Sequence, residues 1–363
     1  MTELEAFVGL NLISNIGSVR LGKLLEVFGS PQEIFSAKYE HLASVSGIGG
    51  QIASDIVSFK KENIEKEFAS SKKQGVNIIT LFDQDYPCIL KEIPGAPLVL
   101  YVLGKINVED NLSFGIVGSR RASFYGLINA ERFASGLSAQ GVTIVSGMAR
   151  GVDTYAHRGA LKAQGRTIAV MGSGFNHIYP AENTDLAKKI ALSGAVISEF
   201  PMDTKPLAQN FPRRNRLISG LSLGILITEA AKNSGALITA DFALEQGRDV
   251  FVLPGRIDSL ESMGTNALIK QGAKLVTCCE DILEELNLGI AKIRKSDNPA
   301  IKQKPSCLKD EGLLYDYIKQ QPIAIDDLVA KTSLTSSQIF TLILRLQFKK
   351  LIKELPGKQF VRS

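Results

Sequence analysis

The feature that most constrains the fold is a regular alternation of apolar runs and helical stretches from Leu112 onward. The runs are rich in valine, isoleucine and leucine, which is typical of strands buried on both faces of a sheet. Because helical stretches separate them, they predict parallel βαβ units in one open, doubly wound α/β sheet. The runs are Phe114–Val117, Val142–Val145, Thr167–Met171, Ala195–Ser198, Gly224–Thr228 and Asp249–Leu253, followed by a strand and a helix around Lys274–Thr277 and Glu280–Leu286.

The flanking sequence divides the chain into four predicted parts. Residues 1–75 form a helical domain, and residues 76–291 form the sheet domain, whose first segment (76–111) supplies short strands at one edge. Residues 292–309 are polar and contain proline, which indicates a linker. Residues 310–363 form a separate C-terminal domain.

The helical domain contains a weak internal repeat. The sequence Ile-Ser-Asn-Ile-Gly-Ser at 13–18 recurs at 45–50 as Val-Ser-Gly-Ile-Gly-Gly, and a helical apolar pattern follows each copy. This arrangement predicts a helix-hairpin-helix (SAM-like) domain, in which glycine amides at a helix N-terminus can hold a phosphate. However, residues 1–111 carry 14 acidic and 10 basic side chains. Because a negative patch repels phosphate, we interpret these glycines as turn residues, with DNA contact as the alternative.

Basic charge is concentrated in the linker. The net charge of the chain is +5, and residues 292–309 hold six basic side chains and one acidic one. The linker therefore accounts for the whole excess. We interpret it as a solvated spacer, and an auxiliary contact with a polyanion is the alternative.

The C-terminal part predicts a winged helix. Helical patterns cover Gly312–Gln320, Ile325–Thr332 and Ser336–Lys350, and a β-hairpin is expected around Pro356-Gly357. The third helix of such a domain can enter a DNA groove. The basic residues favour an anionic partner, although winged helices also bind proteins, so both interpretations stay open. These residues are Arg345, Lys349, Lys350, Lys353 and Lys358.

Composition excludes several classes of protein. Hydrophobic residues make up 45% and charged residues 22%, which is typical of a globular chain. Apolar runs are too short to cross a membrane, and the N-terminus lacks the features of a signal peptide. The four cysteines form no CxxC pair, so neither a metal site nor a disulfide framework is indicated. We expect a cytoplasmic protein without cofactor.

Glycine, arginine and aromatic residues gather after the predicted strands. Because ligands of open parallel sheets bind at the carboxyl ends of the strands, these residues predict a site for phosphate and base. The predicted binding residues are Gly118, Ser119 and Arg120; Ser146, Gly147, Arg150 and Gly151; Phe211, Arg213, Arg214, Asn215 and Arg216; and Lys232. Arg121 and Arg256 add charge there, and Phe175 and Tyr179 are further candidates for stacking.

The run Phe211–Arg216 is the strongest of these signals. Three arginines within it repel one another unless an anion or an acidic partner neutralises them. On a helix Arg213 and Arg216 share one face while Arg214 points elsewhere, so we expect two of the three to contact the ligand.

Titratable groups near this edge have two interpretations. Asp153 and His157 have the spacing of an acid-base pair, but no nucleophile accompanies them, and we expect a buried hydrogen-bonded pair. Glu199 and Glu229 could be catalytic carboxylates. We prefer them as ion-pair partners of the arginines.

Several linked motifs resemble the DprA/Smf family of bacterial DNA-processing proteins. They are GIVGSRRASFYG, VSGMARGVDTYAH, GSGFNHIYPAEN, SEFPMDTKPLAQNFPRRNRLISGLS, TEAAKNSGALITADFALEQGRDVFVLPG and GTNALIKQGA, and they span residues 112–288. The resemblance implies an extended Rossmann-like core that forms homodimers. Gly118, Ser119 and Arg120 match the family's Gly-Ser/Thr-Arg motif, and the run from Phe211 matches its basic pocket.

The resemblance also implies a function in natural transformation. Such proteins bind incoming single-stranded DNA independently of its sequence, protect it, displace single-strand-binding protein and load the recombinase RecA. The alternative is a nucleotide-binding or nucleoside-monophosphate-hydrolysing Rossmann-like enzyme, but the segment Thr228–Thr239 lacks the Pro-Gly-Gly-x-Gly-Thr loop of those enzymes. A pure protein adaptor would leave the clustered arginines unexplained.

Overall fold

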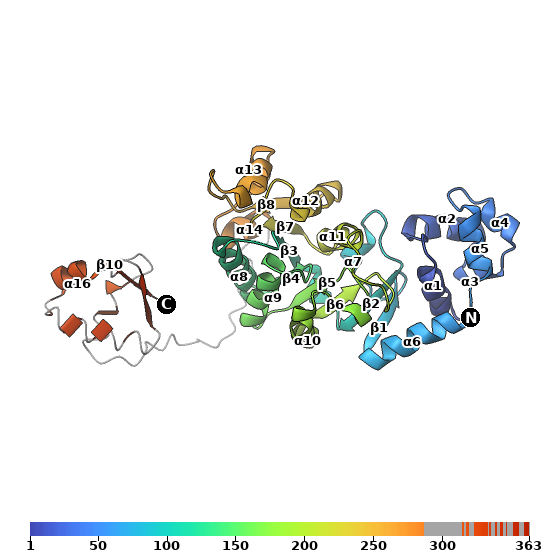
Figure 1. The fold of residues 1–363 in the computed structure, drawn as a ribbon, viewed down its shortest axis with the longest axis horizontal. Coiled ribbons are helices and arrows are strands. Elements are labelled where there is room, and N and C mark those ends of the chain that lie inside the picture. Colours follow the sequence, from blue (N-terminus) through green and yellow to red (C-terminus); the bar gives the residue numbers. More distant parts are fainter. Residues whose placement is uncertain are drawn as a thin grey trace. The chain divides into compact units, whose positions relative to one another are not determined.

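The computed structural model describes residues 1–286 and parts of the segment 314–362. The chain divides into two compact units, Met1–Ala291 and Lys292–Ser363 (Figure 1). Among the described helices, none combines the length and the apolar character that a bilayer span requires.

The first unit is built around a nine-stranded sheet in the order β1-β2-β6-β5-β4-β3-β7-β8-β9. The strands are β1 (Val76–Thr80), β2 (Val99–Gly104), β3 (Ser113–Val117), β4 (Thr143–Ser146), β5 (Thr167–Val170), β6 (Ala195–Ser198), β7 (Gly224–Ile227), β8 (Asp249–Val252) and β9 (Lys274–Leu275). Strands β3 to β9 are parallel to one another, whereas β1 and β2 add an antiparallel edge in which β2 pairs with β6. The predicted doubly wound, mostly parallel α/β fold is confirmed.

Helices cover both faces of this sheet (Figure 1). They are α7 (Cys88–Lys91), α8 (Phe124–Ala139), α9 (Val152–Lys162), α10 (Thr184–Ser193), α11 (Asn210–Gly220), α12 (Gly235–Glu245), α13 (Met263–Lys270) and α14 (Cys279–Glu285), with short 3₁₀ turns η1 (Val108–Asn111), η2 (Phe175–His177), η3 (Ala181–Asn183) and η4 (Leu260–Ser262). Phe114 and Ile116 of β3 pack with α8 and α9, whereas Val117 packs with α11 and α12. Since strand side chains alternate between faces, one short apolar run supplies both cores.

The order of the strands places a crevice beside β3. From β3 the chain passes outward through β4, β5 and β6, and it then returns to pair β7 with the other side of β3. Loops that leave β3 and β7 therefore diverge to opposite faces of the sheet. Such a switch point is where open α/β sheets bind their ligands.

Six helices precede the sheet. They are α1 (Glu3–Leu12), α2 (Ser18–Phe28), α3 (Pro31–Ser36), α4 (Tyr39–Ala43), α5 (Gly50–Val57) and α6 (Glu62–Gln74). The two copies of the sequence repeat form the turns before α2 and α5, with Gly17 and Gly49 as N-caps. Arg20 joins both turns, because its guanidinium donates to the carbonyls of Asn15 at 2.6 Å and Gly47 at 3.0 Å.

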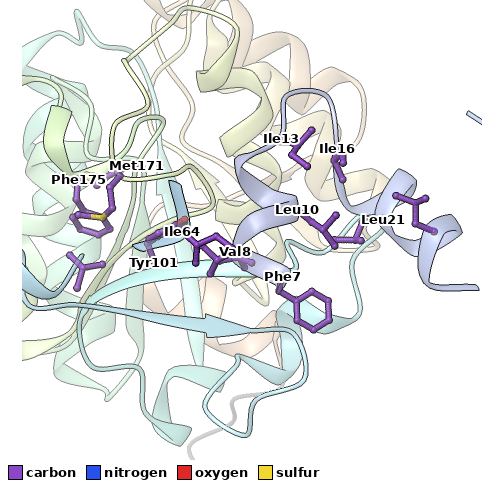
Figure 2. Close-up of a cluster of buried hydrophobic side chains, with 14 of the residues drawn as sticks. Phe7, Val8, Leu10, Ile13, Ile16, Leu21, Ile64, Tyr101, Met171 and Phe175 are labelled. Carbon is purple, nitrogen blue, oxygen red and sulfur yellow. The ribbon is translucent and has the colours of Figure 1, made fainter. Parts of the chain in front are cut away.

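These helices pack against the antiparallel edge of the sheet. Figure 2 shows Val8 of α1 and Ile64 of α6 beside Tyr101 of β2. The same buried cluster continues to Met171 and Phe175, which follow β5. One apolar core therefore joins the N-terminal helices to loops at the carboxyl edge of the sheet.

The second unit contains a small antiparallel sheet in the order β10-β12-β11. Its described elements are β10 (Ile323–Ala324), α16 (Ile325–Lys331), β11 (Ile352–Leu355) and β12 (Gln359–Arg362). A cluster that includes Leu314, Leu346 and Phe360 forms its core. The linker, the turn at Pro356-Gly357 and the basic residues Arg345, Lys349, Lys350 and Lys358 lie outside the described residues.

Candidate nucleic-acid interface

A pocket of about 710 Å³ lies at the carboxyl edge of the sheet, beside the switch point. Loops after five strands, β3 to β7, contribute to its walls. The lining residues are Val117, Gly118, Ser119, Arg120 and Arg121; Ala149 and Asp153; Tyr179; Pro206, Ala208, Phe211, Pro212, Arg214, Asn215 and Ile218; and Ser234, Gly235, Ala236, Ile238 and Thr239.

The loop after β3 is held against the end of β7. The Ser119 amide donates to the Glu229 carbonyl at 2.8 Å, and the Ser119 hydroxyl accepts from the Arg121 amide at 3.1 Å. A Cβ atom at Gly118 would lie 2.6 Å from Cγ2 of Val152, so only glycine fits there. The loop therefore presents the exposed Arg120 side chain from a fixed backbone.

Glu229 anchors the far end of the same loop. Its carboxylate accepts hydrogen bonds from the Ser123 amide at 2.6 Å and the Ser123 hydroxyl at 2.7 Å. The side chain is buried and does not line the pocket. The preferred interpretation of Glu229 as an arginine partner is therefore wrong, because serine groups of the α8 N-terminus occupy its oxygens.

The loop after β4 packs closely on the loop after β3. Gly151 has a φ of 75°, and a Cβ atom there would lie 2.4 Å from the Ser119 carbonyl oxygen. Gly147 leaves room for Arg214, whose Nη2 would lie 2.7 Å from a Cβ at that position. Ser146 is buried and donates to the Ile116 carbonyl at 2.7 Å. These three residues shape the walls without lining the pocket.

Arg214 is a buried cation in the pocket wall. Its Nη1 donates to the carbonyls of Gly147 and Val170, and its side chain faces Asp153 across Gly147. Burial lowers the pKa of Arg214 to about 10, and the charge of Asp153 opposes that shift. Burial likewise raises the pKa of Asp153, which the charge of Arg214 opposes. Arg214 thus keeps its charge at neutral pH.

The other two arginines of this helix face Glu199. Arg216 pairs with its carboxylate and donates to the Gly95 carbonyl at 2.7 Å, while Arg213 Nε lies 3.4 Å from Glu199 Oε1. The interpretation of Glu199 as an arginine partner is confirmed. The predicted orientation is reversed, however: Arg214 lines the pocket, and Arg213 and Arg216 do not.

An aromatic pair forms another wall. The ring centroids of Tyr179 and Phe211 lie 5.7 Å apart with an interplanar angle of 49°. The Arg120 guanidinium lies 4.8 Å from the Phe211 centroid. Phe175, the third stacking candidate, is 2% exposed and belongs to the hydrophobic core, so it offers no free ring face.

The remaining predicted residues divide between the pocket and its surroundings. Asn215 lines the pocket, and its Nδ2 donates to the Gly235 carbonyl at 3.3 Å. Arg150 makes a two-pronged ion pair with Glu182, both distances being 2.9 Å. Lys232 is exposed and lies outside the lining. Of the predicted set, the pocket brings together Gly118, Ser119, Arg120, Phe211, Arg214 and Asn215.

Asp153 and His157 do not form the expected pair in the described structure. Asp153 Oδ2 accepts from the Ala149 amide at 3.2 Å, which closes the loop before α9. His157 Nδ1 lies 2.7 Å from Thr167 Oγ1 on β5. Full burial lowers the pKa of His157 to about 3, so this imidazole is neutral and structural.

The predicted binding residues do not include the wall formed by the N-terminus of α12. Ser234 caps this helix by accepting from the Ala236 amide at 3.3 Å, and Gly235, Ile238 and Thr239 follow it along the pocket. A capping serine followed by a helical pattern, in the loop after the predicted strand, is the available signal. Pro206 and Ala208 carry no such signal, because neither has a chemical group that marks a binding site.

Comparisons with known proteins agree with the fold. Residues 77–287 match the DNA recombination-mediator protein A family, and residues 299–358 match the DprA winged helix domain. The chain is 44% identical to Protein Smf of Escherichia coli over 259 residues, which cover 70% of this chain and 69% of that protein. It is 32% identical to Protein Smf of Synechocystis over 383 residues, covering 96% of each.

Solved structures of DNA processing protein A are also similar to this chain. DNA processing protein A from Streptococcus pneumoniae matches with a TM-score of 0.69 and 35% identity, covering 78% of this chain and 98% of that one. The protein of the same name from Helicobacter pylori, whose single-stranded DNA binding mode has been described, matches with a TM-score of 0.53 and 30% identity. That match covers 59% of this chain and 96% of the other.

Proposed function

This chain belongs to the DprA/Smf family of DNA recombination mediators, and from that premise we propose that its pocket binds single-stranded DNA independently of sequence. The Helicobacter pylori relative binds single-stranded DNA. The pocket here has the matching chemistry, with cations for phosphates and aromatic rings for bases.

The observation that carries the proposal is the meeting of Arg120, Arg214 and Phe211 in one pocket. Arg120 is exposed and forms no ion pair within the described part of the chain, so its charge is available to a phosphate. Arg214 supplies a second positive charge from the wall. Phe211 and Tyr179 offer ring faces that stack on any base, which gives affinity without sequence preference.

Arg213 and Arg216, which were expected from the sequence to contact the ligand, lie outside the pocket lining. Their shared partner Glu199 neutralises part of their charge, and the Arg216 side chain is 15% exposed. We assign them to holding α11 in place. Phosphate contact then falls to Arg120 and Arg214, with Arg121 beside them in the lining.

Salt dependence of binding tests this function. Fluorescence anisotropy with a labelled oligothymidylate, repeated over a range of salt concentrations, measures how many phosphates the protein contacts. Arg120→Ala should weaken binding and lower the slope of log K against log salt by about 0.7, the value for one single-strand phosphate contact. Arg158→Ala, at an exposed position of α9 outside the pocket, is the matched control and should leave the slope unchanged.

Two results would overturn the proposal. One is binding that does not respond to salt. The other is equal affinity for the same length of duplex, because paired bases cannot stack on Phe211.

We further propose that the protein binds DNA without a catalytic step. The carboxylate in the segment Thr228–Thr239 is that of Glu229, and it lies outside the pocket with hydrogen bonds from Ser123. Incubation with AMP should release no adenine above the background of a protein-free sample. Release that Glu229→Gln abolishes would establish the enzyme instead.

The cellular role follows from family membership as a further part of the proposal. It comprises protection of incoming strands in the cytoplasm, displacement of single-strand-binding protein, loading of RecA and a homodimer formed through the Rossmann-like core. The winged helix adds either duplex affinity or a protein contact. Comparing the full chain with a chain that ends at residue 291, the boundary of the first compact unit, separates these two roles in a duplex-binding assay.

A further inference from the structure

The aromatic wall of the pocket belongs to two loops that are joined to each other. In these loops, which follow β5 and β6, the Gly174 amide donates to the Thr204 carbonyl at 2.9 Å, and the Asn176 amide donates to the Met202 carbonyl at 2.9 Å. The first loop continues to Tyr179, and the second leads into α11, which carries Phe211. The backbone bonds therefore join the two loops that place these rings.

Helix α6 of the N-terminal domain holds this element by polar contacts. Glu67 Oε1 accepts from the Met202 amide at 2.7 Å, and the Glu67 side chain is buried. Ser70 Oγ donates to Asn176 Oδ1 at 3.2 Å, and Gln74 Nε2 donates to the same oxygen. The same helix therefore contacts both loops. Glu67 binds the loop after β6, and Ser70 and Gln74 bind the loop after β5.

Apolar packing reinforces these bonds. Met202 and Phe175, one from each loop, are buried in the cluster that contains Val8 and Ile64 of the N-terminal helices. Figure 2 shows Phe175 beside Met171 in this cluster. A shift of the helices would therefore carry both loops with it.

A third link runs through Glu199. Its carbonyl accepts from Asn11 Nδ2 of α1 at 3.4 Å, and its carboxylate pairs with Arg216 of α11. Helix α11 carries Phe211 and Arg214. Two N-terminal helices are thus connected to the binding residues, although no residue of α1–α6 lines the pocket.

We infer that the N-terminal helical domain sets the position of the Tyr179–Phe211 wall and that Glu67 is the positioning residue at the joint. The inference rests on the proposed DNA-binding function of that wall. The Met202 amide is buried and needs an acceptor, and Glu67 supplies it from helix α6. Because coupling between sites is reciprocal, a strand bound at the wall strengthens the attachment of the helices, and loosening the helices weakens the binding of the strand.

Three variants of the full chain test the inference. Glu67→Leu removes the acceptor, whereas Glu67→Gln keeps one acceptor oxygen for the Met202 amide, removes the charge and replaces the second oxygen by an NH₂ group. Leu42→Ala is the control for lost stability, since Leu42 is fully buried in α4, which packs on α5. Hydrogen exchange is measured in segments 174–180 and 199–211 without DNA, and oligothymidylate affinity is measured under conditions in which every variant is folded.

Glu67→Leu should accelerate exchange in both segments and weaken DNA binding about fivefold or more, with an unchanged salt slope because Arg120 and Arg214 remain. Glu67→Gln should restore both properties, and Leu42→Ala should change neither by as much. Unchanged exchange in the two segments of Glu67→Leu, or an equal response in Leu42→Ala, would overturn the inference. The exchange readout needs no DNA, so it decides the inference even if the parent chain binds no DNA and the proposed function fails.

Discussion

The guanidinium of Arg120 lies 4.8 Å from the ring centroid of Phe211, so a cation from the β3 loop covers an aromatic face from α11. A base that stacks on that face must displace the guanidinium. We therefore expect Arg120 to leave the ring for a phosphate as the strand enters. The cation–π contact holds the two residues in reach of one another until then.

Replacing the ring at this contact separates stacking from charge. Phe211→Leu should weaken oligothymidylate binding by about 1–3 kcal/mol, the range for loss of one base–aromatic stack. The salt slope should stay constant because no phosphate contact is lost. Phe124→Leu, which removes an aromatic ring that is 78% exposed and outside the pocket, should leave the affinity unchanged. A drop in salt slope for Phe211→Leu would show that the ring only positions Arg120.

Gly151 should tolerate no side chain. Gly151→Ala combines a φ of 75° with a Cβ atom 2.4 Å from the Ser119 carbonyl oxygen, whereas Gly247→Ala has a φ of 67° and open space. The control should lose about 1–2 kcal/mol of unfolding free energy from backbone strain alone. Gly151→Ala should lose more and should also weaken DNA binding, because the clash displaces the loop that presents Arg120. Urea unfolding measures both losses. Equal losses of unfolding free energy for Gly151→Ala and Gly247→Ala would contradict the close approach of the loops after β3 and β4.

Arg214 and Asp153 should behave as a coupled pair. Arg214→Met leaves the buried Asp153 carboxylate without its cation and should cost about 3–5 kcal/mol of unfolding free energy. Asp153→Asn in the Arg214→Met background should recover part of that loss, so that the two single effects are not additive. DNA binding should stay impaired in the double variant, because the cation of the wall is missing. Additive effects on stability would argue against the pairing.

His157 should make the fold sensitive to mild acid. The folded pKa of about 3 lies below the usual 6.5, so as pH falls below 6.5 the unfolded state takes up a proton that the native state refuses. This group should contribute about 2 kcal/mol to the stability lost between pH 7 and pH 5. His157→Gln should remove that part of the pH dependence, whereas His41→Gln, at an exposed position, should not. Chemical unfolding at pH 7 and pH 5 measures the loss of unfolding free energy between these pH values. An equal loss in the parent chain, His157→Gln and His41→Gln would refute the prediction.

The strands of the core were predictable because parallel strands buried on both faces must be short and apolar. The six predicted runs begin and end within one residue of β3 to β8. The same pattern predicted the carboxyl edge of the sheet as the place where the glycines and arginines gather, because they follow the strands in the sequence. Residues 1–75 as a separate domain and the exact boundaries of the linker stay predictions.

The orientation of α11 was not predictable from its sequence. Helical spacing correctly separates Arg214 from Arg213 and Arg216, but it does not say which face meets the ligand. Glu199 decides this, because a buried carboxylate at the end of β6 attracts two arginines and turns the third toward β4 and β5. Likewise, nothing in residues 1–75 marks Glu67 as a partner of Met202, since that bond depends on how the helices pack against the sheet.

The pocket described above draws its walls from residues between Val117 and Thr239. Its last wall, the start of α12, follows β7, and β7 takes its place beside β3 only after β4, β5 and β6 have been made. On the ribosome, a chain that has emerged only as far as β6 therefore holds Arg120 and Arg121 but lacks Phe211, Arg214 and the α12 wall that complete the pocket. Competence to bind should arise late and abruptly during synthesis, so that partly made chains do not capture nucleic acid.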